Sequence, residues 1–352
     1  MRLLVRADAS HAMGAGHVLR CLAIAQAWAD AGLGELTLAS RELPPSLRAR
    51  YEAEGARVVD LGSPDGCTAR SFEELVRSNA PHVVVMDGYH LGPEDRRAAR
   101  SSGAPLALID DNREVDVSEA ALVINPGPRA HALDYGATPA LRGLEHALLR
   151  RELRRAAEGP PRDLALDRAP VLVTLGGSDP RGLTEPIVAR LRARGVPVVA
   201  LVGALASAGA PDRGLPIEGA TWMRSVDDVV PIFDRVGWAL SAAGGTALEL
   251  AALGHPVVSL ATVSNQRALA HAWAERVAPH DVGVGPSFDL VGLEGEALAR
   301  ALDEAVLALV RLRGDAAASA RHARAARARL DGQGAARIAR ALALLGKSQR
   351  AT

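Results

Sequence analysis

Short runs of β-branched and aliphatic residues alternate with longer stretches of helical character along most of the 352-residue chain. In the first half the runs lie at Leu3–Ala7, Leu36–Ser40, Arg57–Leu61, Val83–Met86, Leu106–Ile109 and Leu122–Ile124. Helices fit between them, beginning near Gly16, Pro44, Ser71 and Pro93. This alternation predicts β-α-β units and a mostly parallel sheet, because a parallel strand needs a crossover connection.

The same pattern is repeated in the second half, after a charged segment with no strand signal. That segment, 156–169, contains Gly159-Pro160-Pro161 and is typical of an interdomain linker. The later runs lie at Pro170–Leu175, Val198–Val202, Trp238–Ser241, Val257–Leu260 and Val282–Val284, and the chain is helical from Leu293 onward. The sequence therefore predicts an α/β fold with two Rossmann-like doubly wound domains, 1–155 and 170–334, facing across a cleft, and a C-terminal helix and tail at 335–352.

The charge balance and the cysteine count exclude several classes of protein. Basic and acidic residues number 41 each, so the chain lacks the net field that steers proteins onto nucleic acid. Cys21 and Cys67 have no metal-ligand spacing and are too few for a disulfide scaffold. The apolar run at the start ends at Arg6, and no run approaches the roughly 20 residues that cross a bilayer. We expect a cytoplasmic protein without membrane insertion.

The loop after the first strand is the first candidate for chemistry. Gly14 and Gly16 let backbone approach a ligand, and His17 falls in the first turn of the following helix. The positive end of the helix dipole favours a neutral imidazole there, which a general base requires. The alternative is an ordinary strand-to-helix turn in which His17 caps or packs.

The second candidate follows the Trp238 strand and opens another helix. Gly244 and Gly245 can expose N–H groups to a phosphate, Thr246 adds a hydroxyl, and Glu249 lies one turn later, where it could accept ribose hydroxyls. The alternative is a capping box, with Thr246 as N-cap and Glu249 three residues later, which would explain the same residue pattern without a ligand.

Three further loops also lie at the carboxyl ends of expected strands. Gly177 and Ser178 could line phosphates, although an Asp-Pro turn at Asp179 is the simpler reading. The amides of Asn265 and Gln266 could bind sugar hydroxyls or act as a helix cap. Asp87 and Tyr89 could face the cleft or form a solvated turn. Five such loops together predict one ligand-binding site.

These strings resemble those of the UDP-2,4-diacetamido-2,4,6-trideoxy-β-L-altropyranose hydrolases of pseudaminic acid biosynthesis, and of the related spore-coat polysaccharide proteins. The specific parts are Gly14-Ala15-Gly16-His17-Val18-Leu19-Arg20-Cys21-Leu22 and Gly176-Gly177-Ser178-Asp179-Pro180. Supporting parts are Arg6-Ala7-Asp8, Asp87-Gly88-Tyr89, Asp110-Asp111, Asn125-Pro126, 147–152, Met223, 244–250, Asn265-Gln266 and 331–334. The chain departs from the family at Gly88, where a histidine is usual, and at 261–264.

The resemblance implies a glycosyltransferase-B architecture and a hydrolysis without metal or cofactor that releases UDP with inversion at the anomeric carbon. It further implies a role in nonulosonic acid synthesis for surface polysaccharide or flagellin glycosylation, in association with other enzymes of that pathway. His17 would be the base with Tyr89 beside it, and the nucleotide would be held by Met223, Gly244, Gly245, Thr246 and Glu249. The remaining substrate contacts would come from Asp8, Gly14, Gly16, Asp87, Gly177, Ser178, Asn265 and Gln266.

Two other functions use the same features. A glycosyltransferase of this architecture would pass the sugar to a polysaccharide, lipid or peptide acceptor. A silent binding protein would hold the nucleotide sugar without reaction, but it has no need of His17 and Glu249 together with both glycine loops.

Overall fold

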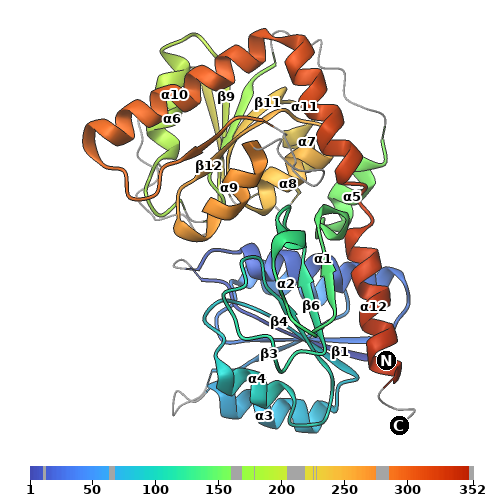
Figure 1. Ribbon diagram of the computed structural model, residues 1–352. Coiled ribbons are helices and arrows are strands. Elements are labelled where there is room, and N and C mark those ends of the chain that lie inside the picture. The colour runs from blue at the N-terminus through green and yellow to red at the C-terminus, as the bar shows by residue number, and fades with distance from the viewer. Residues whose placement is uncertain are drawn as a thin grey trace. The chain divides into compact units, whose positions relative to one another are not determined.

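The computed structural model describes residues 1–10, 13–62, 68–159, 169–177, 179–203, 219–224, 226, 228–274 and 285–348. The chain forms two compact units (Figure 1). The first unit comprises Met1–Arg151 and Gln333–Thr352, and the second unit comprises Glu152–Gly332. The boundary therefore lies four residues before the expected end at residue 155, and the C-terminal helix is part of the first unit.

The first unit is built on a seven-stranded parallel sheet in the order β3-β2-β1-β4-β5-β6-β7. Its strands are β1 (Arg2–Ala7), β2 (Glu35–Ser40), β3 (Arg57–Asp60), β4 (Val83–Asp87), β5 (Leu106–Ile109), β6 (Leu122–Asn125) and β7 (Ala140–Arg142). Its helices are α1 (Gly16–Asp30), α2 (Pro45–Ala53), α3 (Thr68–Asn79), α4 (Pro93–Ala99) and α12 (Gly334–Ser348), with short 3-10 turns η1 (Ala130–Ala132) and η2 (Leu144–His146).

Alternating side chains of the central strands pack on the two faces of this sheet. Leu3 and Val5 of β1 lie in a core shared with α1, α2 and α12, whereas Leu4 and Val84 lie in the opposite core with α3 and α4. Because both faces are covered, the central strands consist almost entirely of buried apolar residues. This explains why they stand out as continuous hydrophobic runs in the sequence.

The second unit has a six-stranded parallel sheet in the order β10-β9-β8-β11-β12-β13. Its strands are β8 (Val171–Thr174), β9 (Val198–Val202), β10 (Ala220–Arg224), β11 (Trp238–Ala242), β12 (Val257–Ala261) and β13 (Ser287–Asp289). Its helices are α5 (Arg151–Ala157, starting at the boundary), α6 (Thr184–Arg192), α7 (Val230–Phe233), α8 (Gly245–Ala252), α9 (Arg267–Ala274), α10 (Gly295–Gly314) and α11 (Ala316–Arg329), with the 3-10 turn η3 (Ser264–Gln266).

Each sheet has one point where the strand order reverses. In the first unit the reversal lies between β1 and β4, and in the second unit between β8 and β11. The connections leaving two such neighbouring strands run to opposite faces of the sheet, so a crevice opens outside their carboxyl ends. In both units the reversal is therefore the expected ligand position, and the loops after β1, β4, β8 and β11 contain four of the five candidate motifs.

The α/β class and the doubly wound sheets are confirmed, and so are the central strands and the helices after Leu293. Three strands were missed: β7, β10 and β13, each at the end of a sheet. An edge strand is paired on one side only, and the residues of these three strands are half-buried or exposed. They therefore carry no buried hydrophobic run to reveal them. The expected strand at 282–284 lies outside the described residues.

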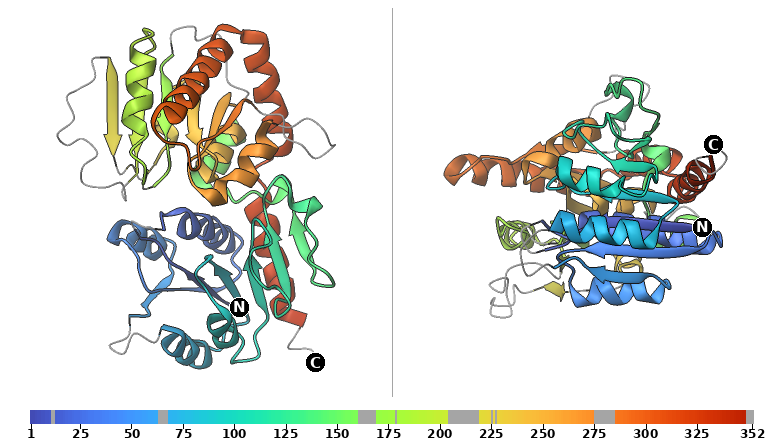
Figure 2. Two further views of the ribbon diagram at one scale, coloured as in Figure 1. Left: turned by 60° about the vertical axis from the view of Figure 1, so that its left-hand side comes forward. Right: turned by 90° about the horizontal axis from the view of Figure 1, so that it is seen from below.

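The chain leaves the first unit and returns to it on adjacent segments. Arg151 donates to both carboxylate oxygens of Glu54 at 2.9 and 2.7 Å. Helix α12 packs along α1 (Figure 2). A Cβ on Gly334 would lie 2.3 Å from the Ala147 carbonyl oxygen, so only glycine allows this approach. The motifs at 147–152 and 331–334 therefore contain the residues that hold the chain where it leaves the first unit and where it returns to it.

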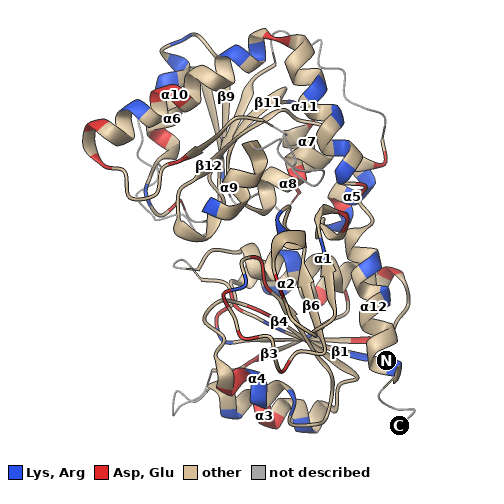
Figure 3. Cartoon of the chain, viewed as in Figure 1, with Lys and Arg blue, Asp and Glu red and all other residues tan. Residues whose placement is uncertain are grey.

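Acidic and basic residues both occur on helices of each unit (Figure 3). Within the ranges that the structure describes, no helix is long and apolar enough to cross a membrane.

Candidate active site

The loop after β1 delivers His17 to the reversal point of the first sheet. Gly14 adopts φ +76°, a left-handed conformation that favours glycine, and its N–H donates to the Ser10 carbonyl at 2.8 Å. Helix α1 begins two residues after Gly14, at Gly16, which is exposed and has nothing within 4 Å of an added Cβ. Helix α1 has no side-chain cap, so His17 does not serve as one.

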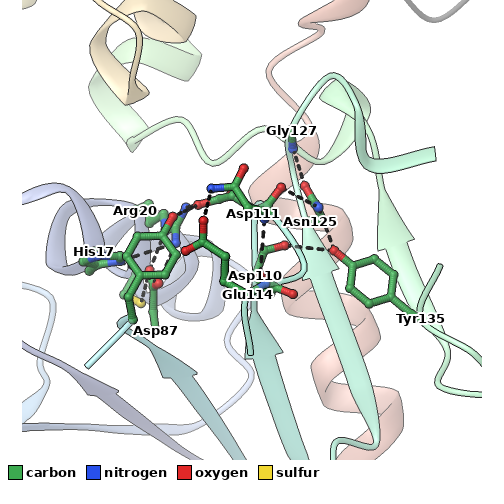
Figure 4. A network of polar contacts seen from close by, with 12 residues as sticks. His17, Arg20, Asp87, Asp110, Asp111, Glu114, Asn125, Gly127 and Tyr135 are labelled. Atoms are coloured by element: carbon green, nitrogen blue, oxygen red, sulfur yellow. Dashed lines mark hydrogen bonds and ion pairs between the residues drawn. The ribbon is translucent and has the colours of Figure 1, made fainter. Parts of the chain in front are cut away.

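His17 instead pairs with Asp87, the last residue of β4. The ring nitrogen Nδ1 lies 2.7 Å from Asp87 Oδ1 (Figure 4). The strands β1 and β4 are neighbours, with Ala7 opposite Asp87, and this pairing brings the two loops together. Since an ionised carboxylate only accepts hydrogen bonds, Nδ1 carries a proton, and in the neutral ring the lone pair therefore lies on Nε2.

Arg20 holds the Asp87 carboxylate in a two-point contact. Its Nε donates to Oδ2 at 2.5 Å and its Nη2 to Oδ1 at 2.6 Å, while Cys21 Sγ lies 3.7 Å from Oδ2. Burial opposes ionisation of Asp87, but Arg20 and His17 outweigh it and hold the pKa of Asp87 well below its usual range. Asp87 is 1 % exposed, so its carboxylate contacts His17, Arg20 and Cys21 and presents almost no surface to a ligand.

Tyr89 stands beside His17 with an edge-to-face ring contact, the centroids 5.1 Å apart. Its hydroxyl donates to Asp111 Oδ2 at 2.9 Å, and Arg20 Nη1 donates to the same oxygen at 2.6 Å. Burial and the Asp111 carboxylate raise the pKa of Tyr89 well above its usual range. Tyr89 is therefore a neutral phenol whose proton is committed to Asp111.

A second layer supports the Asp111 loop. The Asn125 side chain donates to the Asp111 carbonyl at 3.1 Å and to the Tyr135 hydroxyl at 2.8 Å (Figure 4). Burial raises the pKa of Tyr135 to about 12, so its hydroxyl stays protonated and donates to the Asp110 carbonyl at 3.1 Å. Burial also raises the pKa of Asp110, which is 1 % exposed.

Asp8 was expected to contact the substrate, but the structure places its carboxylate inside the first unit, 0 % exposed. Arg6 donates to it at 2.6 Å, the Arg41 backbone N–H at 2.6 Å, and His90 lies 2.7 Å from its second oxygen. Burial opposes ionisation, yet the hydrogen bonds from His90 and Arg6 hold the pKa of Asp8 well below its usual range. In this conformation Asp8 ties the loops after β1, β2 and β4 together.

In the second unit, α8 starts at the reversal point without a side-chain cap. Its N-cap is Gly244, in extended conformation, and helix residue one is Gly245. The capping box expected as the alternative, with Thr246 as N-cap, is therefore wrong. An added Cβ on Gly244 or Gly245 would meet nothing within 4 Å, so there is open space beside the first amides of the helix. Thr246 and Glu249 are half-buried on this helix.

The loop after β8 has a mainly structural explanation. Asp179 adopts φ +38° and its carboxylate accepts from the backbone N–H groups of Leu183 and Thr184, both at 3.0 Å, at the start of α6. Gly177 packs so tightly on Gly203 that a Cβ on Gly203 would lie 2.4 Å from the Gly177 Cα. Ser178 lies outside the described residues.

The remaining candidates also lie in the second unit. Asn265 is exposed, whereas Gln266 Oε1 accepts from the Thr262 backbone N–H at 2.8 Å and from its hydroxyl at 3.1 Å. Gln266 thus fixes the turn after β12. Met223 lies on the edge strand β10, half-buried, and pairs with Leu201.

The sequence missed the roles of Arg20 and Asp111. The spacing of three residues between His17 and Arg20, which places both on one helix face, could have indicated the first. Asp111 is 91 residues from Arg20 in sequence, and only the strand order joins them. Within the described ranges, no three His, Cys, Asp or Glu side chains gather as a metal site would require.

No family model matches this chain. A relative named UDP-2,4-diacetamido-2,4,6-trideoxy-β-L-altropyranose hydrolase, from Campylobacter jejuni subsp. jejuni serotype O:2, is 22% identical over 197 residues, which span 54% of this chain and 66% of the relative. The crystal structure of MurG from Acinetobacter baumannii has a TM-score of 0.60 at 15% identity, covering 97% of this chain and 99% of that one. Anabaena Alr3699/HepE in complex with UDP-glucose has a TM-score of 0.60 at 14% identity, covering 100% of both chains. The structural matches show the glycosyltransferase-B fold.

Proposed function

We propose that this protein is an enzyme that hydrolyses a UDP-linked 2,4-diacetamido-2,4,6-trideoxyhexose and releases UDP and the free sugar for nonulosonic acid synthesis. The observation that carries the proposal is the His17–Asp87 pair at the reversal point of the first sheet, which leaves Nε2 of His17 as a base. The similarity to the Campylobacter jejuni hydrolase supports the reaction, and the structure of Alr3699/HepE with UDP-glucose supports the class of ligand.

The proposed reaction is a single displacement at the anomeric carbon. A water molecule gives one proton to His17 Nε2 while its oxygen bonds to the anomeric carbon, and the bond from that carbon to the β-phosphate oxygen breaks with its electron pair on UDP. The sugar anomer is inverted, and the imidazolium formed is stabilised by Asp87. UDP leaves as a phosphate anion, so no proton donor is needed on that side.

In this proposal the second unit holds the nucleotide. The uncapped start of α8 offers backbone N–H groups and the positive end of a helix dipole to the diphosphate. The carboxylate of Glu249 would accept the ribose hydroxyls, the Met223 backbone would meet the base, and the amides of Asn265 and Gln266 would meet the N-acyl groups. The charge on the leaving UDP is thereby met by fixed dipoles.

The test is an acceptor-free incubation of the purified protein with UDP-2,4-diacetamido-2,4,6-trideoxy-β-L-altrose and, separately, with UDP-N-acetylglucosamine. We expect UDP and free sugar from the first substrate alone, followed by NMR, with the inverted anomer appearing first. UDP binding without release from either substrate would contradict the hydrolase and favour a transferase that needs an acceptor.

A further inference from the structure

Arg20 donates hydrogen bonds through all three of its nitrogens, and through Asp87 and Asp111 these bonds connect His17, the proposed base, with Tyr89 beside it. Two nitrogens bind the carboxylate of Asp87, under His17, and the third binds Asp111 at 2.6 Å. Asp111 in turn accepts the proton of Tyr89, whose ring packs on that of His17. The five side chains therefore form a closed ring of contacts.

The position of the His17 proton follows from the distances in this ring. Nδ1 has two possible partners: Asp87 Oδ1 at 2.7 Å, to which it would donate, and Arg20 Nη2 at 3.4 Å, from which it would accept. Arg20 Nη2 already donates to Asp87 Oδ1 at 2.6 Å. The contact with Asp87 is the shorter, so Nδ1 is a donor and, in the neutral ring, Nε2 is an acceptor.

The direction of the Tyr89 hydrogen bond follows in the same way. Asp111 Oδ2 lies 2.9 Å from the hydroxyl oxygen, and a carboxylate held 2.6 Å from a guanidinium nitrogen is ionised and can only accept. The phenolic proton is therefore directed at Asp111. The lone pairs of the Tyr89 oxygen stay available on the other side.

We propose that Arg20 and Asp111 are positioning residues that make His17 and Tyr89 both hydrogen-bond acceptors, so that one water molecule donates both of its protons to them. A water bound in this way has both O–H bonds fixed, and a lone pair of its oxygen remains for attack on the anomeric carbon. The kinetic part of this inference rests on the proposed hydrolysis.

Few charged or titratable side chains lie near the His17 ring among the described contacts. Arg20 and the buried thiol of Cys21 come from α1, Asp87 from the end of β4, and Tyr89 from the loop after it; Asp111 follows β5. Arg20 is thus the one cation in direct contact with Asp87 among the described contacts. Its removal leaves the imidazole beside uncompensated carboxylates, which favours protonation of the ring.

The first test separates the charge of Arg20 from its geometry. We expect Arg20→Gln to lower kcat about 100-fold with little change in KM, and to move the acidic limb of the rate profile to higher pH. Arg20→Lys keeps the charge but not the three-nitrogen contact, so we expect a loss of about tenfold with the acidic limb unmoved. Asp116→Asn is a control for the loss of a charge in the same unit, because the Asp116 carboxylate accepts from its neighbour Ser118, whose backbone N–H lies at 3.0 Å.

The second test is a double-mutant cycle. Asp111→Asn and Tyr89→Phe are each expected to lower kcat about tenfold. If Asp111 acts through Tyr89, the double variant should lose no more than the worse single variant. Multiplied losses would overturn the role of Asp111, as would an Asp111→Asn enzyme of wild-type rate.

The third test needs no turnover and therefore distinguishes this inference from the proposed function. The ¹⁵N shifts of the His17 ring, assigned by comparison with His17→Asn, report the tautomer directly at neutral pH. We expect the Nδ1–H tautomer in the wild type, and protonated ring or the other tautomer in Arg20→Gln. A wild type without hydrolysis would contradict the function alone. An unchanged His17 tautomer in Arg20→Gln, or Nε2–H in the wild type, would overturn the inference even in an active hydrolase.

Discussion

The two units have the same strand order around their reversal points, but the residues at these points differ in kind. In the first unit the loops after β1 and β4 carry ionised side chains held by short contacts, such as Arg20 to Asp87 at 2.5 Å. In the second unit the corresponding loops after β8 and β11 carry paired glycines and the uncapped start of α8. One edge presents side-chain charge, and the other presents backbone amides and open space.

Many groups of the first unit have a shifted pKa. Those whose pKa departs clearly from its usual range include Asp8, Arg20, Cys21, Tyr51, Asp87, Tyr89, Asp110, Asp116, Tyr135 and Arg151. Perturbed pKa values concentrate where protons are moved. The two copies of the fold thus differ in what their reversal points carry, and under the proposed function chemistry and ligand holding are divided in the same way.

The largest expected effect is on kcat and comes from a substitution in the first unit, where the proposed base lies. His17→Phe removes the base but leaves Arg20 paired with Asp87, so we expect kcat to fall about 10²- to 10⁴-fold. UDP affinity, measured by calorimetry, should stay unchanged because no nucleotide contact is proposed for the first unit. His131→Phe, an exposed histidine of the same unit, is the control. A His17→Phe enzyme with wild-type kcat, or without UDP affinity, would contradict the proposed division of catalysis and nucleotide binding between the two units.

Acid should affect the first unit before the second. The pKa values of Asp8 and Asp87 are lowered in the folded chain, against burial, by their cationic neighbours. Each therefore contributes stability that is present above about pH 4 and is lost as the pH falls towards the folded pKa, about 2–3 kcal/mol per carboxylate. Asp110, with a raised pKa, acts in the opposite direction and offsets part of this loss.

Tryptophan fluorescence can follow the two units separately. Trp28 lies in the first unit, and the other tryptophans, Trp222, Trp238 and Trp273, lie in the second. In an acid titration we expect the wild type to show a transition that is absent from Trp28→Phe at the same pH. Coincident transitions in both proteins would mean that the ionic network does not set the order of unfolding.

How far the sequence predicted the fold depends on burial. Strands such as Val83–Asp87 are covered on both faces and appear as hydrophobic runs, whereas Ala220–Arg224 at a sheet edge does not. The helix starts at Gly16 and Pro93 were predicted correctly, since glycine and proline mark such turns.

The site was predicted only as far as local pattern extends. Asp87 ends β4, and His17 lies in the helix that follows β1. Their contact depends on β1 lying next to β4 in the sheet. Asp8 also follows a strand, yet it shares the parity of Arg6 and pairs with it inside the unit. Sequence position marks the end of a strand, but not the direction in which a side chain leaves it.

A smaller effect is expected from filling the open space at the start of α8. Gly245→Val should raise the Kd for UDP about tenfold, because its side chain would lie where the diphosphate is proposed to approach the helix amides. Stability should change by less than about 0.5 kcal/mol, since Gly245 is exposed and an added Cβ there meets no protein atom within 4 Å. Gly314→Val, at an equally open glycine of the same unit, is the control. Equal UDP affinity in both variants would place the diphosphate elsewhere.

The smallest effect tests whether the second unit relies on local backbone contacts. Asp315 caps α11 by accepting from the Ala318 N–H at 2.8 Å, and Asp315→Ala should cost about 1 kcal/mol of unfolding free energy. Glu294 occupies the same position before α10 without a side-chain hydrogen bond, so Glu294→Ala should cost close to nothing. Urea unfolding at neutral pH measures both. A loss of several kcal/mol from Asp315→Ala would show that the second unit, like the first, depends on individual carboxylates, and the contrast between the units would then be confined to their reversal points.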